Sequence, residues 1–309
     1  MFHTVMRILF IAVLFVPGFA NAEIRLHKVF TDNMVIQRNL PIRIFGWAEA
    51  GQEVVVEFAG QAQTARADGK GFWKAELKAM EANAKGQTLK VSAKDGGNKI
   101  ERANILIGDV WICGGQSNME WVMRSFNQLA PLVEGVHLPN VRLLVVKKNP
   151  PETNEHEDLI ALESVYKDSW QECGGTFLSN FSAVGYFFGA KLNKDLNVPI
   201  GLIRSAVGGT RIEPWIPSDA WAGLSKAEQG KATASGLYNA MIRPLALFPI
   251  KGVIWYQGES SSTWAVLYEK HFKALIQGWR KVWGQGDFPF LFVQIAPFKS
   301  GDNDVVGES

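Results

Sequence analysis

The stretch ANILIGDVWICGGQSNME, residues 103–120, decides the fold of the C-terminal part of this chain. It begins with an apolar run, Ala103–Cys113, of the kind found in strands that are buried on both faces. Two glycines and a polar segment follow directly. Further apolar runs are found at Val141–Val146, Ile200–Ala206, Gly252–Tyr256 and Phe288–Ile295.

Helical patterns lie between these runs. Residues Ala183–Leu196 have one such pattern, and a second has an apolar stripe at helical spacing, formed by Tyr268, Phe272, Leu275, Ile276 and Trp279. Strands that alternate with helices are typical of a mostly parallel sheet covered by helices. We therefore predict a doubly wound α/β domain over residues 104–309.

Residues 23–103 follow a different pattern. Short runs alternate between apolar and polar residues, and turns with glycine separate them. The runs are Pro41–Trp47, Glu53–Phe58, Gly71–Leu77 and Thr88–Ala93. Several short strands at this spacing predict a small, all-β, sandwich-like domain with a structural or glycan-facing role.

The first 22 residues have the features of a secretory signal peptide. Arg7 precedes the apolar run Ile8–Val16, and Ala20-Asn21-Ala22 offers a cleavage site. As a membrane anchor the run is too short, because it spans about 14 Å of helix against a hydrocarbon core of about 30 Å. We expect cleavage near Ala22, a secreted or periplasmic protein, and no membrane association afterwards.

Composition narrows the range of partners. The 309 residues are 47% hydrophobic with a formal net charge of +2, so the chain is not disordered, and no basic stripe points to nucleic acid. Cys113 and Cys173 have no metal-ligand spacing, and we expect no metal. Export would permit a disulfide between them, although a buried free thiol is the more common outcome for Cys113.

Three polar clusters follow predicted strands, where ligands bind in open α/β sheets. They are Gly114–Glu120 with Ser117, Gly208-Gly209-Thr210, and Gln257–Ser260. Taken singly, each has an ordinary explanation: Ser117 caps a helix, the glycines form a loop and Gln257 sits in a turn. Together they offer a hydroxyl, a backbone N–H and an amide N–H on one rim, which is what acyl transfer through a serine requires.

The segments GDVWICGGQSNMEW (residues 108–121), GGTRIEPW (208–215) and WYQGES (255–260) resemble the sialate O-acetylesterase family of SGNH hydrolases. Residues 29–60 look like the β-rich region that precedes the catalytic domain in bacterial members. The resemblance runs from about residue 26 to about residue 298. It implies an SGNH-hydrolase-like parallel sheet with flanking helices after the small β domain.

The resemblance also implies roles for particular residues. Ser117 would be the nucleophile, and its own N–H, a backbone N–H of Gly208 or Gly209, and the Gln257 amide would form the oxyanion hole. The implied reaction removes an O-acetyl group from a sugar, of the sialate 9-O-acetyl type, through an acetyl-serine intermediate. It needs no metal or organic cofactor.

The chain departs from the family pattern at two places. Ser261 stands where the family usually has Asn, which leaves any polar contact from that position open. The Asp-x-x-His block, which supplies the base and its orienting acid in such enzymes, occurs nowhere in the 309 residues. We therefore expect an esterase chain truncated before that block, with little activity. His156 and His271 remain alternative bases, although His271 borders the apolar stripe of a helix, which favours a structural role.

Four further residues are candidates for substrate contact. Trp121 and Trp215 closely follow the first and second motifs, and an indole face can stack on a sugar ring. Arg211 could meet a sugar carboxylate or pair with a nearby acid, and Glu259 could contact the substrate or orient the Gln257 loop. The expected partner is an O-acetylated sugar or glycan. An acetylxylan or xyloglucan acetylesterase, or a non-catalytic glycan-binding remnant, remain alternatives.

Overall fold

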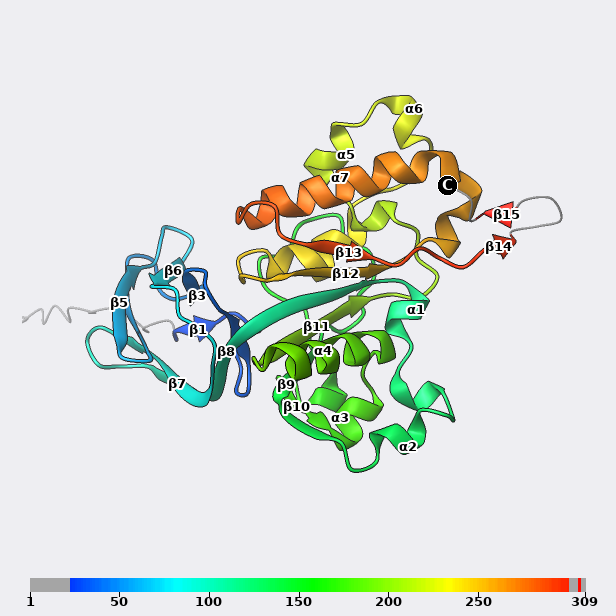
Figure 1. The fold of residues 1–309 in the computed structure, drawn as a ribbon. Coiled ribbons are helices and arrows are strands. Elements are labelled where there is room, and N and C mark those ends of the chain that lie inside the picture. The colour runs from blue at the N-terminus through cyan, green and yellow to red at the C-terminus, as the bar shows by residue number, and fades with distance from the viewer. Residues whose placement is uncertain (1–22, 300–304, 307–309) are drawn as a thin grey trace, which may run out of the picture.

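The computed structural model describes residues 23–299 and 305–306 (Figure 1). The expected signal peptide, residues 1–22, lies outside the described residues. Within the described part, no helix combines the length and the apolar character needed to cross a membrane.

The N-terminal unit consists of two small sheets, as the alternating runs predicted. β1, β3 and β6 form an antiparallel sheet, while β4, β5 and β7 continue antiparallel from β8, which β2 joins in parallel. Apolar side chains of both sheets share one core. The strands are β1 (Arg25–Leu26), β2 (Val35–Gln37), β3 (Ile42–Trp47), β4 (Glu53–Phe58), β5 (Gln61–Arg66), β6 (Phe72–Leu77), β7 (Asn83–Ala93) and β8 (Lys99–Gly115).

The C-terminal unit is built on a mixed sheet in the order β10-β9-β11-β8-β12-β13. All of these strands are parallel except β10, which pairs antiparallel with β9 at one edge. The five predicted apolar runs all contribute strands to it, and two of them match in full. The strands besides β8 are β9 (His137–Val145), β10 (Gln171–Gly174), β11 (Ile200–Ala206), β12 (Gly252–Tyr256) and β13 (Phe290–Phe292).

Two long helices cover opposite faces of this sheet, α4 (Ala183–Leu196) and α7 (Ala265–Trp283) (Figure 1). Because side chains alternate along a strand, Cys113 of β8 packs in the cluster that contains α4, whereas its neighbour Ile112 packs in the cluster that contains α7. The predicted α/β architecture with flanking helices is confirmed. The faces of the sheet are thus filled by packing, which leaves the ends of its strands for function.

Short elements connect the strands and helices. They are α1 (Ser117–Glu120), η1 (Met123–Ser125), α2 (Ala130–Val133), η2 (Ser164–Tyr166), α3 (Gly175–Ser179), η3 (Glu213–Trp215), α5 (Ser218–Ala222), α6 (Lys226–Gln229), η4 (Tyr238–Ile242), η5 (Arg243–Leu245) and η6 (Glu259–Trp264), with the pair β14 (Phe298–Lys299) and β15 (Val305–Val306).

Strand β8 belongs to both units. Its first half pairs with β7, and its second half lies between β11 and β12 in the middle of the C-terminal sheet. The boundary expected from the sequence, between residues 103 and 104, therefore falls inside one continuous strand. The long strand running from one unit into the other is plain in Figure 1.

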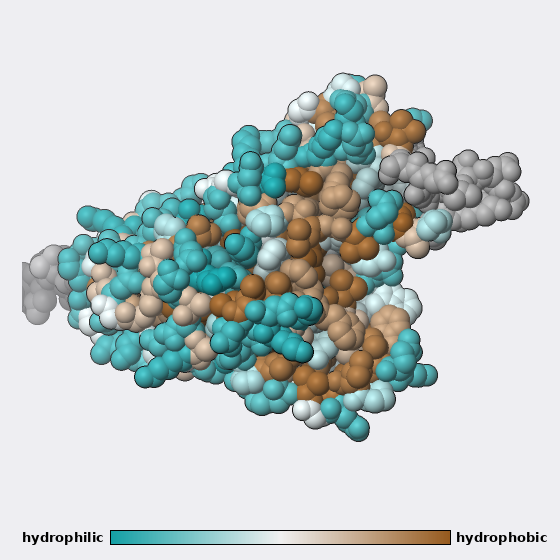
Figure 2. Space-filling model, in the orientation of Figure 1, coloured by the Kyte–Doolittle hydropathy of each residue, from teal (hydrophilic) through white to brown (hydrophobic). Residues whose placement is uncertain are grey.

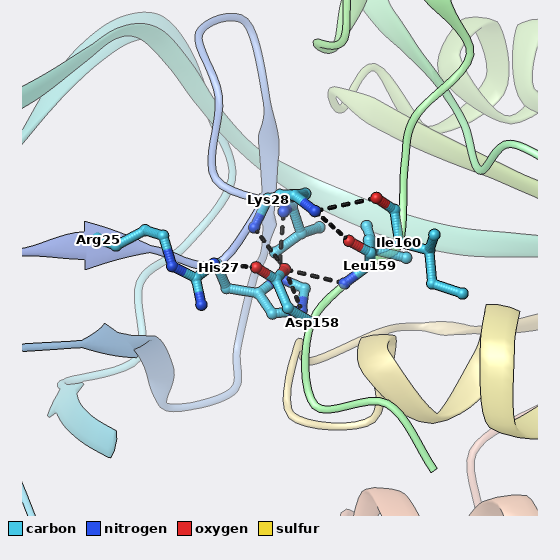
Figure 3. Close-up of polar contacts among 7 residues, drawn as sticks. Arg25, His27, Lys28, Asp158, Leu159 and Ile160 are labelled. Atoms are coloured by element: carbon cyan, nitrogen blue, oxygen red, sulfur yellow. Dashed lines mark hydrogen bonds and ion pairs between the residues drawn. The ribbon is translucent and has the colours of Figure 1, made fainter. Parts of the chain in front are cut away.

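A polar clamp around Asp158 joins the two units a second time (Figure 3). Asp158 Oδ1 accepts the backbone N–H of Lys28 (2.9 Å) and lies 3.2 Å from His27 Nε2, while Oδ2 pairs with Arg25. The Lys28 ammonium donates to the backbone carbonyls of the next two residues after Asp158. The segment between β9 and η2 is thereby held against the N-terminal unit.

The face of the molecule in Figure 2 is divided by hydropathy. The N-terminal unit is mostly hydrophilic, whereas apolar side chains gather over the middle of the C-terminal unit, where Figure 1 places β13 and α4. On β13 and just after it, Leu291, Phe292 and Val293 are exposed, and Phe292 is 59% accessible.

Candidate active site

The turn after β8 brings Ser117 to the carboxyl end of the sheet. Gly115 has φ +136°, and a Cβ there would lie 2.1 Å from the carbonyl oxygen of Tyr256, so no larger residue fits. The backbone N–H of Gln116 donates to the same carbonyl (3.0 Å), and α1 begins at Ser117. The strand therefore turns sharply, and the serine lies where ligands bind in open α/β sheets.

The loop after β11 lies directly beside Ser117. A Cβ built on Gly208 would be 3.5 Å from Ser117 Cβ. The Gly208 N–H donates to Glu120 Oε2 (2.7 Å), and Glu120 Oε1 pairs with the ammonium of Lys148. The N–H groups of Ser117 and of Gly209 have no acceptor among the described residues. Of the predicted backbone donors, the N–H groups of Ser117 and Gly209 thus have no acceptor among the described residues, whereas the alternative donor at Gly208 already holds a carboxylate oxygen.

The Gln257 side chain ties together the three segments that follow β8, β11 and β12. It is buried, and its Nε2 lies 3.1 Å from Gln116 Oε1, 3.2 Å from the Thr210 carbonyl and 3.0 Å from Ser261 Oγ. Its Oε1 has no partner among the described residues. In this arrangement the amide donates to its protein neighbours, and its role as an oxyanion donor stays a prediction.

Ser261 and Glu259 also hold together the segments that follow β8, β11 and β12. Ser261 Oγ accepts the backbone N–H of Ile212 (3.2 Å) as well as the Gln257 amide. The polar contact that the sequence left open at position 261 is therefore present. Glu259 Oε1 accepts from Asn118 Nδ2 (2.6 Å), which fixes η6 to the residue that follows the serine.

The remaining predicted contact residues lie in different environments. Trp121 is 48% exposed beside the site. Trp215 is fully buried, and its indole Nε1 donates to Thr210 Oγ1 (3.1 Å), so it supports the loop from beneath and offers no face to a ligand. The Arg211 guanidinium pairs with the buried carboxylate of Glu213.

None of the described histidines contacts Ser117. His271 is buried, with Nε2 2.7 Å from the Glu228 carbonyl and Nδ1 3.8 Å from Glu213 Oε1. His27 lies in the Asp158 clamp, where burial chiefly lowers its pKa to about 4. The other two, His137 and His156, lie beside glutamates at other positions.

A cleft of about 910 Å³ lies next to the Ser117 turn, with Glu120 in its wall, and sequence patterns hardly indicated it. Its walls include Glu120, Trp121, Arg124, Lys148, Tyr166 and Arg204. Arg204 interrupts the apolar run of β11 two residues before its end, which was the one available signal. Loop residues such as Lys148 carry no pattern that would place them at the site.

The two cysteines are poorly placed for nucleophilic chemistry. Both cysteines are buried free thiols, and burial raises the pKa of Cys173 to about 12. No group of three potential ligands for a metal ion occurs in the part of the chain that the structure describes. The role of Ser117 as nucleophile stays a prediction.

Known proteins share this architecture. The family model for carbohydrate esterase, sialic acid-specific acetylesterase, matches residues 107–309. The chain is 35% identical to a carbohydrate acetylesterase from Xanthomonas citri, with a TM-score of 0.81 and coverage of 91% of this chain and 62% of that one.

Curated sequences agree with this match. Sialate O-acetylesterases from Pongo abelii and Homo sapiens are each 37% identical over an alignment of 212 residues that covers 62% of this chain. The matched region spans 40% of the length of these relatives. By the family match over its C-terminal unit, this chain belongs to the sialic acid-specific acetylesterase family of carbohydrate esterases.

Proposed function

We propose that this protein is a serine carbohydrate O-acetylesterase in which Ser117 is the nucleophile. The observation that carries the proposal is the position of Ser117 at the carboxyl end of β8, next to Gly208 and to two backbone N–H groups that have no acceptor among the described residues. Membership of the family supports the same reaction class.

In the proposed reaction, Ser117 Oγ attacks the acetyl carbonyl carbon and loses its proton. The N–H groups of Ser117 and Gly209 stabilise the oxyanion that forms. The ester C–O bond then breaks, the sugar leaves as an alcohol after taking up a proton, and acetyl-serine remains. Water hydrolyses this intermediate to acetate and returns the proton to Ser117. For Gly208 to act as a further donor, its N–H must exchange the Glu120 carboxylate for the substrate.

The proton on Ser117 Oγ needs an acceptor for attack at useful rates. No described histidine is placed to take it, because each of them is engaged elsewhere. We therefore expect the 309 residues on their own to turn over slowly, through attack by a Ser117 hydroxyl that no positioned base assists.

The leading substrate is a sialic acid acetylated on its 9-hydroxyl. Acetylated xylan and xyloglucan are alternatives, and a glycan-binding protein without turnover is the competing class. We also propose export through the signal peptide, with cleavage near Ala22. The N-terminal residue of protein recovered from a periplasmic fraction tests this point.

The experiment compares the chain with its Ser117→Ala variant on 4-nitrophenyl acetate and on 9-O-acetyl-N-acetylneuraminic acid. Acetate release above the variant, together with a Ser117 peptide that carries one acetyl group in mass spectra, supports the proposal. Ser218→Ala is a matched control, since that serine is exposed on α5. Equal rates and no acetylated peptide would show that Ser117 is not a nucleophile in this chain.

A further inference from the structure

The cleft beside Ser117 has an unbalanced set of charges. Three cations, Arg124, Lys148 and Arg204, line it together with two carboxylates, Glu120 and Glu163. Lys148 pairs with Glu120. Among the described residues, neither arginine of the cleft forms an ion pair with an acid.

Other buried or half-buried arginines of the protein do form ion pairs. Arg38, Arg142 and Arg211 are each half-buried or buried, and each lies against a carboxylate. Arg204 is also half-buried, yet its only hydrogen bond within the described part of the chain is a long one of 3.4 Å, from Nη1 to the Glu120 carbonyl. A partly desolvated guanidinium without an anion is costly, which points to an anion that comes from outside.

The position of Arg204 relates this charge to the chemistry. It stands near the end of β11, in register with Cys113 of β8, so its side chain lies at the same edge of the sheet as Ser117. Glu120 lines the cleft and also hydrogen-bonds the Gly208 N–H next to Ser117. A ligand in the cleft would therefore be adjacent to the serine.

An aromatic surface lies on the same wall. Trp121 is 48% exposed and packs against Phe126, with ring centroids 5.4 Å apart, so one part of the indole is fixed and the rest faces solvent. An indole beside two arginines suits a ligand that has both an apolar ring face and a carboxylate. A pyranose that carries a carboxylate has these two features.

We propose that Arg124 and Arg204 form a carboxylate-binding subsite that selects acidic sugars for the neighbouring serine. This inference rests on the proposed function, because it assigns the cleft to the sugar of the acetyl ester. Arg204 would bind the carboxylate at the base of the cleft, and the exposed Arg124 would bind it from the rim. Trp121 would lie under the ring. Neutral acetylated glycans would lack the ionic part of this recognition.

Calorimetric titration with non-acetylated ligands tests the subsite independently of turnover. The ligands are the methyl α-glycoside of N-acetylneuraminic acid, its carboxyl methyl ester, and methyl glucuronide as a second source of a sugar carboxylate. We expect the acid to bind about tenfold more tightly than its ester, the difference that one charge-assisted contact provides. Glucuronide binding equal to that of the sialoside would assign the subsite to sugar acids in general, and weaker binding would assign it to sialosides.

Variants locate the effect. Arg204→Gln and Arg124→Gln should each weaken binding of the acid about tenfold and leave binding of the ester unchanged. Arg66→Gln, on the exposed surface of β5, is the matched control and should change neither. Thermal unfolding confirms that each variant is folded, and the exposed Arg124 offers a test even if Arg204→Gln is unstable.

Three results would overturn the subsite: no binding of the acid to the wild-type chain, equal binding of acid and ester, or normal acid binding by both arginine variants. A negative Ser117 experiment with a positive titration would leave a sugar-acid binding site and refute only the esterase. The reverse combination would leave the esterase and refute only the subsite.

Discussion

Replacing Gly115 with alanine tests the claim that the turn after β8 is what positions Ser117. Two separate costs arise. The backbone at φ +136° is strained for a residue with a Cβ, at about 1–3 kcal/mol. The new Cβ would also lie 2.1 Å from the Tyr256 carbonyl, and moving β12 away from β8 costs about another 1–3 kcal/mol. Gly115→Ala should therefore lower the free energy of unfolding by about 2–6 kcal/mol in total.

Gly209→Ala provides the matched comparison. Gly209 also has positive φ, at +74°, but nothing lies within 4 Å of a Cβ built there. Its replacement should cost only the backbone term, about 1–2 kcal/mol. Guanidinium unfolding followed by tryptophan fluorescence gives both values.

Labelling of Ser117 with a fluorophosphonate, read by mass spectrometry, reports the site itself and should fall more in Gly115→Ala than in Gly209→Ala. Equal unfolding midpoints for the two variants would refute the argument that the Tyr256 carbonyl closes the turn.

Three other predictions concern burial, charge and association. The pKa of His27 is about 4 in the folded protein and 6.5 in the unfolded chain, so the unfolded chain binds more protons between these pH values. The free energy of unfolding should therefore fall by up to about 3 kcal/mol as the pH drops from 6.5 to 4. Urea unfolding across that range should show a flatter pH profile for His27→Gln. Ser261→Ala removes an acceptor from two buried donors and should lower the free energy of unfolding by about 1–3 kcal/mol in chemical denaturation. A decrease as small as that of the exposed Ser218→Ala would contradict the structural role of these hydrogen bonds. The exposed apolar edge at β13 should make the chain self-associate, and Phe292→Lys, which places a charge there, should reduce this association in sedimentation velocity. A wild-type chain that stays monomeric at high concentration would contradict the prediction.

Much of the fold was predictable because the central strands are buried on both faces. Ile200–Ala206 and Gly252–Tyr256 became β11 and β12 with the same bounds, and Ala183–Leu196 became α4. β5 escaped prediction because QAQTAR lies on a sheet edge and is largely exposed, so no burial imposes an alternating pattern on it. Short edge strands in general depend on their partners more than on their own residues.

The site was predictable only in part. The motifs correctly indicated that the segments after β8, β11 and β12 converge, because carboxyl ends of parallel strands share one edge. They could not show that the Gln257 amide is used by neighbouring protein groups, or that Trp215 points inward while Trp121 points outward. Those outcomes depend on side-chain direction, which a sequence pattern at a strand end does not determine.

The continuity of β8 bears on how the molecule comes apart. Because one backbone segment carries hydrogen bonds of both sheets, melting either unit removes the template on which the other is assembled. Calorimetry should then record a single endotherm, and amide protons along β8 should exchange among the slowest in the protein. The small β unit would then not unfold separately, because it is built on the first half of the same strand that leads to Ser117.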